Sequence, residues 1–109
     1  MFAFEIPGQR FSLPAGADVA RFRFVSANAS SNGVPATAAT PIIGVSMNQA
    51  KAGEVLEIAD GLVMVEAGGA VTAGVAVASN ADGQAVAGDG PAIAITSATA
   101  AGELITVKL

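Results

Sequence analysis

The sequence of 109 residues contains no cysteine, histidine, tryptophan or tyrosine. It therefore lacks the imidazole, thiol and phenol groups that most often act as bases, nucleophiles or metal ligands. Without cysteine there is no disulfide framework, and the redox compartment is left undetermined. Charged residues make up only 13% of the chain, roughly half the share in an average globular domain. These absences exclude most classes of enzyme.

The chain is instead rich in small and aliphatic residues, with 25 alanines, 13 glycines and an apolar share of 52%. This content predicts a compact fold, and the length predicts one domain. The net charge of −4 argues against a nucleic-acid partner, which would require a basic face. Ser26 to Ala50 is uncharged, but Pro35 and Pro41 interrupt it, so it does not predict a membrane helix. The N-terminal segment shows no basic stretch before an apolar run, so no signal peptide is expected.

The aromatic residues are concentrated at the N-terminus, where all five phenylalanines lie within the first 24 residues. Phe2, Phe4 and Ile6 alternate with smaller or polar residues, which is typical of a strand or an extended arm. The sequence therefore divides into an N-terminal arm or first strand over residues 1–15 and a β domain over residues 16–109.

A second alternating segment, Arg21 to Val25, predicts a strand with two arginines on one face and Phe22 and Phe24 on the other. The polar segment from Ser26 to Thr40 is interrupted by Asn-Gly and predicts a long hairpin loop or an irregular strand.

Beyond Pro41 the pattern is β throughout. Asp60-Gly61 lies between two alternating runs, Glu54 to Ala59 and Leu62 to Glu66, and this arrangement predicts a two-residue hairpin. In that register Ile58 would lie opposite Val63.

Two further strand pairs are predicted. The first is a hairpin that turns at Asn80 to Gly83 and joins Val75–Val77 to Ala85–Val86, and the second pairs Ile93–Ile95 with Leu104–Val107. The fold class is therefore all-β. We expect a small single-domain β-sandwich or barrel of about six to eight short strands, with an extended N-terminal arm.

An internal repeat supports this organisation. Ala52 to Ile58 (AGEVLEI) is matched by Ala101 to Val107 (AGELITV), and each copy follows a short apolar strand and an alanine-rich connector. We interpret the repeat as one supersecondary unit used twice; two copies are too few for a solenoid.

No arrangement of polar residues predicts chemistry. Glu54 and Glu57 lie on opposite faces of a predicted strand, so they do not form the close carboxylate pair that acid–base catalysis requires. Asn80 to Gly83 resembles part of a calcium loop, but Ala78 and Asp89 occupy the end positions, which favours an Asx-type turn. We therefore predict no catalytic residue, no cofactor and no metal site.

The surface remains as the candidate for function, because exposed apolar residues commonly mark interfaces. The N-terminal segment is the strongest candidate, since extended alternating segments bind partners by strand addition or arm exchange. Its proposed contact residues are Phe2, Phe4, Ile6, Arg10 and Phe11. Arg21 and Arg23 form a second, weaker candidate patch that could meet an acidic partner.

The chain also resembles the small capsid cement or head decoration proteins of phages, over about residues 16 to 109. The motifs that carry the resemblance run in this order: Asp18-Val19, Phe22-Arg23-Phe24-Val25, Pro41-Ile42-Ile43-Gly44-Val45, Asn48-Gln49, Ala52-Gly53-Glu54, Gly61 to Gly68, Ala73-Gly74, Asp82 to Val86, and Ala98 to Leu109. The sequence departs from the family pattern by one extra apolar residue after Pro41 and by Ala94 in place of glycine.

The resemblance implies a structural virion protein on the outer capsid surface, made in the bacterial host cytoplasm, that bridges major capsid subunits and so stabilises the shell. Its implied partners are the major capsid protein and further copies of itself, with a trimer favoured, and neither nucleic acid nor membrane. The arm and the arginine patch would then contact the capsid or a neighbouring copy. Two alternatives remain: a β-structured module of a phage tail or surface appendage that mediates protein or carbohydrate attachment, and a small enzyme or metal protein.

Overall fold

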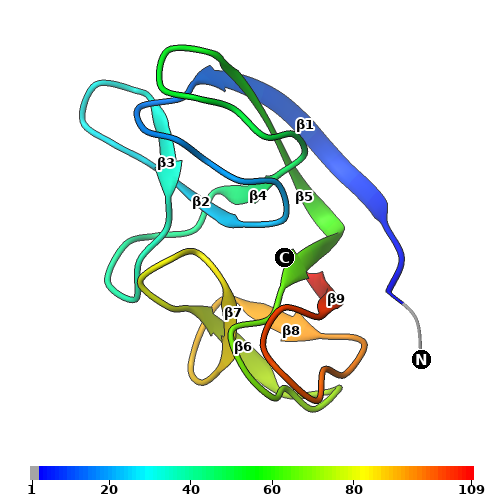
Figure 1. Ribbon diagram of the computed structural model, residues 1–109. Coiled ribbons are helices and arrows are strands. Elements are labelled where there is room, and N and C mark those ends of the chain that lie inside the picture. Colours follow the sequence, from blue (N-terminus) through cyan, green and yellow to red (C-terminus); the bar gives the residue numbers. More distant parts are fainter. Residues whose placement is uncertain (1–2) are drawn as a thin grey trace.

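A computed structural model of the chain, described for residues 3–109, is built from nine strands (Figure 1). The strands are β1 (Ile6–Pro14), β2 (Phe24–Ala27), β3 (Gly33–Pro35), β4 (Gly44–Ser46), β5 (Val55–Glu66), β6 (Ala76–Ser79), β7 (Ala85–Ala87), β8 (Ala92–Ala94) and β9 (Leu104–Lys108). The described part of the chain contains no helix, and so none long enough to cross a membrane. The predicted all-β class is confirmed.

The strands belong to one curled sheet (Figure 1) in which every named pair is antiparallel. Its order is β3-β2-β4-β5-β9-β8-β6-β7, and β1 lies off this path and pairs with β5. Nine strands are present where six to eight were predicted. The residues before Pro14 are not separate from this sheet, because β1 is hydrogen-bonded along the first half of β5.

The hairpin predicted at Asp60-Gly61 is wrong, because β5 runs through this point as one strand of 12 residues. Ile58 pairs with Phe11 of β1, whereas Val63 pairs with Val107 of β9. Gly61 has a φ of +88°, and β1 shows a register shift at the same level. The Asp-Gly pair therefore forms a bulge and bend, since its positive φ serves a bulge as well as a turn.

The other predicted strand pairs are confirmed. β6 and β7 form the hairpin around Asn80, whose side-chain oxygen accepts hydrogen bonds from the N–H groups of Asp82 (2.9 Å) and Gln84 (3.0 Å). This is the predicted Asx-type turn. β8 pairs with β9, and the polar segment after Ser26 turns between β2 and β3.

The internal repeat extends through residues 6–109 and divides them into residues 6–60 and 61–109. The elements β1, β2, β3, β4 and the first part of β5 correspond in order to the second part of β5 and to β6, β7, β8 and β9. In both halves the second and third elements form a hairpin, and the fourth element joins it to the fifth. The strand order of the sheet is therefore symmetric about the contact between β5 and β9.

Backbone details match between the halves. Three pairs of equivalent residues share a positive φ: Phe22 and Gly74, Ser31 and Gly83, and Gly53 and Gly102. Equivalent loop hydrogen bonds also recur: Val19 and Ala50 exchange N–H and C=O groups in the first half, as Val71 and Ala98 do in the second. The predicted repeat is thus confirmed, and it covers more of the chain than the two similar segments.

The repeated turns before β5 and β9 are held in the same way. The Glu54 carboxylate accepts a hydrogen bond from the Lys51 N–H (2.7 Å), and the Glu103 carboxylate accepts one from the Thr99 N–H (3.1 Å). The Thr99 hydroxyl also donates to Glu103. These hydrogen bonds lower the pKa of the Glu103 carboxyl below its usual value, and the bond from the Thr99 hydroxyl has the largest effect.

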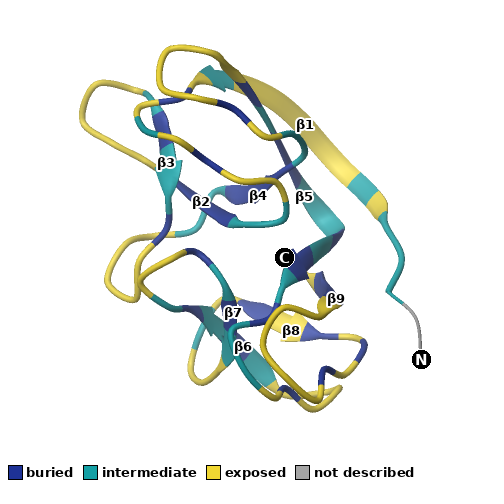
Figure 2. Ribbon diagram, in the orientation of Figure 1, coloured by how far each residue is buried: buried dark blue, intermediate teal, exposed yellow. Residues whose placement is uncertain are grey.

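The buried side chains form two clusters. Figure 2 shows buried residues, in dark blue, in both halves of the molecule. The smaller cluster consists of Ala15, Val19, Val25, Ala50, Leu56 and Ile58. Each of these has an equivalent in the larger cluster: Ala67, Val71, Val77, Ala98, Ile105 and Val107. The larger cluster also takes in Phe24, Ala36, Val45 and Ala59 from the first half. The first half therefore completes the core of the second.

Candidate functional site

β1 carries three of the five contact residues proposed for the N-terminal segment. The side chains of Ile6 and Phe11 are 64% and 40% exposed. The exposed Arg10 forms an ion pair with Glu57 across the β1–β5 ladder, at 2.5 Å. Figure 2 shows β1 as an exposed strand along one side of the molecule. These three residues therefore lie together on one accessible strand.

The outer edge of β1 is open among the described residues, because β5 is the one strand that pairs with it there. Ala15 donates its N–H to the Glu54 carbonyl directly opposite, so Leu13 and Phe11 also direct their backbone groups toward β5. The backbone groups of Arg10 and Ser12 then point outward, and Pro14 offers a carbonyl alone. Such an edge can accept a further strand.

The start of the chain crosses toward the second half. The Thr106 hydroxyl accepts a hydrogen bond from the Phe4 N–H and donates one to the Phe4 carbonyl, both at 2.6 Å. The Glu5 carboxylate accepts a hydrogen bond from the N–H of Met64. Phe4 is therefore half-buried and held by backbone contacts, whereas Phe2 lies outside the described residues.

The predicted pairing of Arg21 and Arg23 on one strand face is wrong. β2 begins only at Phe24, and Phe22 has a φ of +66°, which breaks the alternation of an extended strand. The Arg21 guanidinium lies over the Phe22 ring, 4.5 Å from its centroid. Arg23 turns toward the second half instead, where it pairs with Glu66 at 2.7 Å. The two arginines do not form a common patch.

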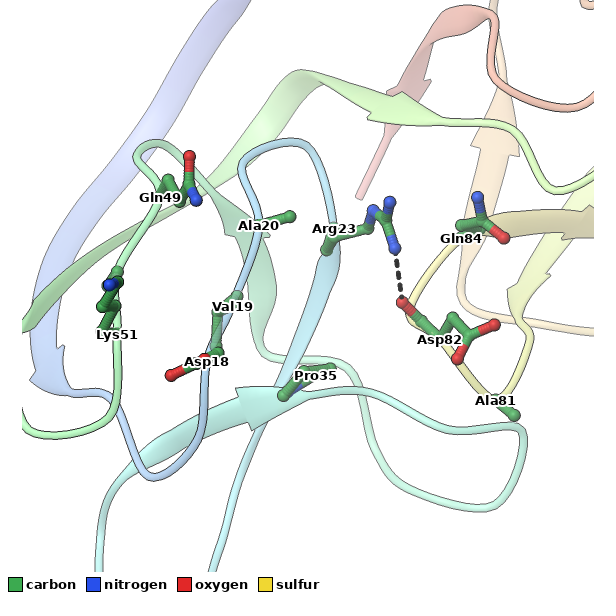
Figure 3. Close-up of a pocket in the computed structure, with 11 residues that line it drawn as sticks. Asp18, Val19, Ala20, Arg23, Pro35, Gln49, Lys51, Ala81, Asp82 and Gln84 are labelled. Atoms are coloured by element: carbon green, nitrogen blue, oxygen red, sulfur yellow. Dashed lines mark hydrogen bonds between the residues drawn. The ribbon is translucent and has the colours of Figure 1, made fainter.

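Arg23 borders a pocket of about 580 Å³ between the two halves (Figure 3). Its guanidinium donates a hydrogen bond to the Asp82 carbonyl at 3.1 Å, the contact drawn in the figure. The residues that line the pocket are Asp18, Val19, Ala20, Arg23, Pro35, Gln49, Ala50, Lys51, Ala81, Asp82 and Gln84. No motif indicated this pocket, because its walls come from loops that are far apart in the sequence.

Several polar groups at and beside the pocket bind other residues of the protein. The Glu66 carboxylate accepts hydrogen bonds from Arg23 and from the Gln84 side chain, each at 2.7 Å. One carboxylate oxygen of Asp18 accepts a hydrogen bond from the Ala52 N–H. The contacts of Arg23 with Glu66 and with the Asp82 carbonyl join the two halves. Residues 3–109 contain no cluster of three or more acidic side chains that could hold a metal ion. The polar groups beside this pocket therefore hold the two halves of the protein together.

A search of curated proteins found no match. The family model of the phage cement proteins, in contrast, matches residues 7–109. The chain belongs to this family. As a cement protein it is a structural component of the phage virion, associated with the capsid.

The cement protein is also similar to a solved structure, the N base of the head fiber protein gp8.5 of bacteriophage phi29. The two share 21% sequence identity with a TM-score of 0.74, and the match covers 91% of each chain. At this identity the likeness establishes the shared fold. The family model covers residues 7–109 and therefore includes nearly all of β1, which lay outside the resemblance seen in the sequence.

Proposed function

We propose that this cement protein binds the outside of an assembled phage capsid and stabilises the shell by bridging neighbouring major capsid subunits. The match of residues 7–109 to the cement protein family carries this proposal. The physical logic is multivalency: many weak contacts, repeated over a symmetric lattice, add up to tight binding. Because the protein would bind the closed shell and not free subunits, binding shifts the equilibrium toward the shell.

The proposed function requires a surface that contacts the capsid and requires no catalysis. It assigns the cement protein no catalytic residue, no cofactor, and neither a nucleic-acid nor a membrane partner. The protein would be made in the bacterial host cytoplasm and would act on the outer capsid surface as an oligomer, with a trimer favoured by the three-fold positions of an icosahedral lattice.

The contact surface of the proposal is the N-terminal segment with β1. Ile6 and Phe11 offer exposed apolar area, and Arg10 adds a charge beside them. The open edge of β1 offers backbone groups to which an extended segment of a capsid subunit could add. Phe2 and Phe4 would extend this surface. Arg21, exposed and stacked on Phe22, remains a weaker candidate, and Arg23 is committed to Glu66.

An alternative function is attachment of an appendage to the head. The observation that favours it is the fold shared with the N base of a phage head fiber. A base of this kind would bind the capsid without holding its subunits together. The two functions therefore differ in their effect on the stability of the shell and not in whether heads are bound.

The deciding experiment is co-sedimentation with expanded, DNA-free heads of the cognate phage, followed by thermal denaturation of the decorated shells. We expect saturable pelleting at a fixed ratio to the major capsid protein and a raised shell melting temperature. Binding with an unchanged melting temperature would favour the attachment function. No binding at any stage of shell expansion would overturn both.

The contact surface is tested by two substitutions of equal exposure. Ile6→Lys places a charge on the proposed contact, where the side chain is 64% exposed, and Val55→Lys does the same at a residue that is 66% exposed and not in the proposed set. We expect Ile6→Lys to weaken pelleting at least several-fold, since it desolvates an unpaired charge. Equal binding by both variants would remove the N-terminal segment from the contact.

A further inference from the structure

The two halves of the molecule fit each other through two different faces. The covering face belongs to the first half and consists of Arg23, Phe24, Val45 and Met47, all of which contact the second half or its core cluster. The receiving face belongs to the second half and consists of Val63, Val65, Glu66 and Gly83. Phe24 donates its N–H to the Gly83 carbonyl at 2.8 Å, and Arg23 pairs with Glu66.

The repeat places a second copy of the covering face on the second half, where nothing described covers it. The equivalents of Arg23, Phe24, Val45 and Met47 are Val75, Ala76, Ile93 and Ile95. Val45 is fully buried, whereas Ile93 is 42% exposed. Val75 and Ile95 are each 37% exposed. This second covering face thus holds three of the large apolar side chains that the molecule exposes.

The first half correspondingly carries a second receiving face. The equivalents of Val63, Val65, Glu66 and Gly83 are Phe11, Leu13, Pro14 and Ser31. Val63 is fully buried, whereas Phe11 is 40% exposed. Leu13 is half-buried, and Ser31 is exposed and has a positive φ, as Gly83 does. A surface that is buried between the halves is therefore repeated, uncovered, on the outside of the molecule.

The two uncovered faces match in size and charge. Within the chain the large Phe24 and the smaller Val63 belong to the same buried cluster; between copies the equivalent positions are the small Ala76 and the larger Phe11. The ion pair of Arg23 and Glu66 is replaced at the equivalent positions by Val75 and Pro14, which are both apolar. A large residue opposite a small one is thus replaced by a small residue opposite a large one. An ion pair is likewise replaced by two apolar residues. Both exchanges preserve complementarity.

We propose that the second covering face of one molecule binds the second receiving face of another, so that copies of the cement protein associate head to tail. The contact between copies would repeat the contact between halves except for the hydrogen bond from the Glu66 N–H to the Phe22 carbonyl, because the equivalent Pro14 has no N–H. Because the two faces differ, the interface is heterologous and closes into a ring when the rotation permits, as in a trimer. This inference rests on the oligomer of the proposed function and assigns Phe11 to a neighbouring copy, leaving Ile6 and Arg10 for the capsid.

We assign a second copy of the chain to these faces. The reason is that a covering face and a receiving face already fit each other inside the molecule, and the two exposed faces are their equivalents. The remaining exposed side chains provide a contrast. Val55 and Leu104 are equivalent to each other and are exposed in both halves, at 66% and 38%. They belong to no face that is buried between the halves, so they serve as control positions.

The test is the oligomeric state of the free protein, without heads, by sedimentation velocity with interference detection, since the chain has no tryptophan or tyrosine. Ile93→Asp blocks the covering face and Phe11→Asp blocks the receiving face. The control is Leu104→Asp, at a side chain of similar exposure (38%). We expect the wild type and the control to form a concentration-dependent oligomer and each of the two face variants to be monomeric.

Mixing the two face variants decides whether the contact is head to tail. Each variant keeps one intact face, so an equimolar mixture should form a one-to-one dimer that grows no further. Failure of the mixture to associate would overturn the head-to-tail contact, and self-association of one face variant alone would show that like faces meet. Should Phe11→Asp not fold, as judged by circular dichroism, Ser31→Arg blocks the same face from an exposed loop.

Other outcomes are equally decisive. A wild type that stays monomeric at all concentrations, or oligomers that both face variants still form, would overturn the proposal. Monomeric protein whose binding to heads is nevertheless lost in Ile93→Asp would show that the capsid occupies the face. Binding to heads is measured separately. A protein that self-associates but does not bind heads would refute the proposed function without contradicting the head-to-tail contact.

Discussion

Arg23 illustrates how much a single residue can contribute to joining the halves. Its backbone N–H donates a hydrogen bond to the Ser46 hydroxyl, while its guanidinium donates to the Glu66 carboxylate and to the Asp82 carbonyl. Its side chain is 23% exposed and that of Glu66 is 27% exposed, so the pair is shielded from solvent more than a surface ion pair. Removing one partner leaves the other charge partly buried and uncompensated.

We therefore predict that Glu66→Ala lowers the free energy of unfolding by roughly 1 to 3 kcal/mol. Both Arg23 and the Gln84 amide lose their acceptor. The comparison is Glu57→Ala, which breaks the exposed pair with Arg10 and should cost less than about 1 kcal/mol. Urea denaturation followed by circular dichroism measures both, and a double-mutant cycle with Arg23→Ala isolates the pairwise energy. Equal losses in the two variants would contradict the prediction.

At the scale of the element, β5 determines the architecture. Its first part pairs with β1 and β4, its second part pairs with β9, and the bulge at Gly61 lies between them. A side chain at Gly61 would place its Cβ 2.6 Å from the Gly8 nitrogen. Glycine is thus required here for two reasons, the positive φ and the close approach of β1.

Gly61→Ala should accordingly destabilise the protein more than Gly53→Ala. Both glycines have a φ of +88°, but nothing lies within 4 Å of a Cβ added at Gly53. We expect a loss of about 1 kcal/mol at Gly53 from the backbone alone, and roughly 2 to 4 kcal/mol at Gly61, where backbone must also move. Denaturation midpoints measured in urea test this order, and a smaller loss at Gly61 would refute the close approach.

At the scale of the whole molecule, the two halves are unequal in what they supply. The second half uses Phe24, Ala36, Val45 and Ala59 of the first half to complete its core cluster. The smaller cluster of the first half contains no residue from the second. The halves therefore form one domain with a shared core, although the chain repeats itself.

Because the core is shared, we predict a single cooperative unfolding transition. Amide signals of Val25 in the first half and Val77 in the second, followed by NMR through a urea titration, should share one midpoint. Phe24→Ala should lower the free energy of unfolding by about 3 to 5 kcal/mol and shift both signals together. Separate midpoints for the two halves would show that each folds alone.

The amino-acid sequence by itself determined what depends on composition and on neighbouring residues. The lack of histidine and cysteine excluded most catalytic chemistry, and the Asx turn at Asn80 followed from a pattern of four residues. Ile6 and Phe11 were predicted as contact candidates and are exposed on β1. These features need no knowledge of distant segments.

Only the tertiary structure decided which strands meet. Asp60-Gly61 fits both a hairpin and a bulge, and the observed bulge goes with the pairing of the two parts of β5 with β1 and β9, which are distant in sequence. The position of the Arg23 side chain likewise depends on Glu66, which lies in the other half. Local patterns specify backbone conformation, whereas burial depends on contacts between distant segments, and those decide which repeated face is covered and which is left for a partner.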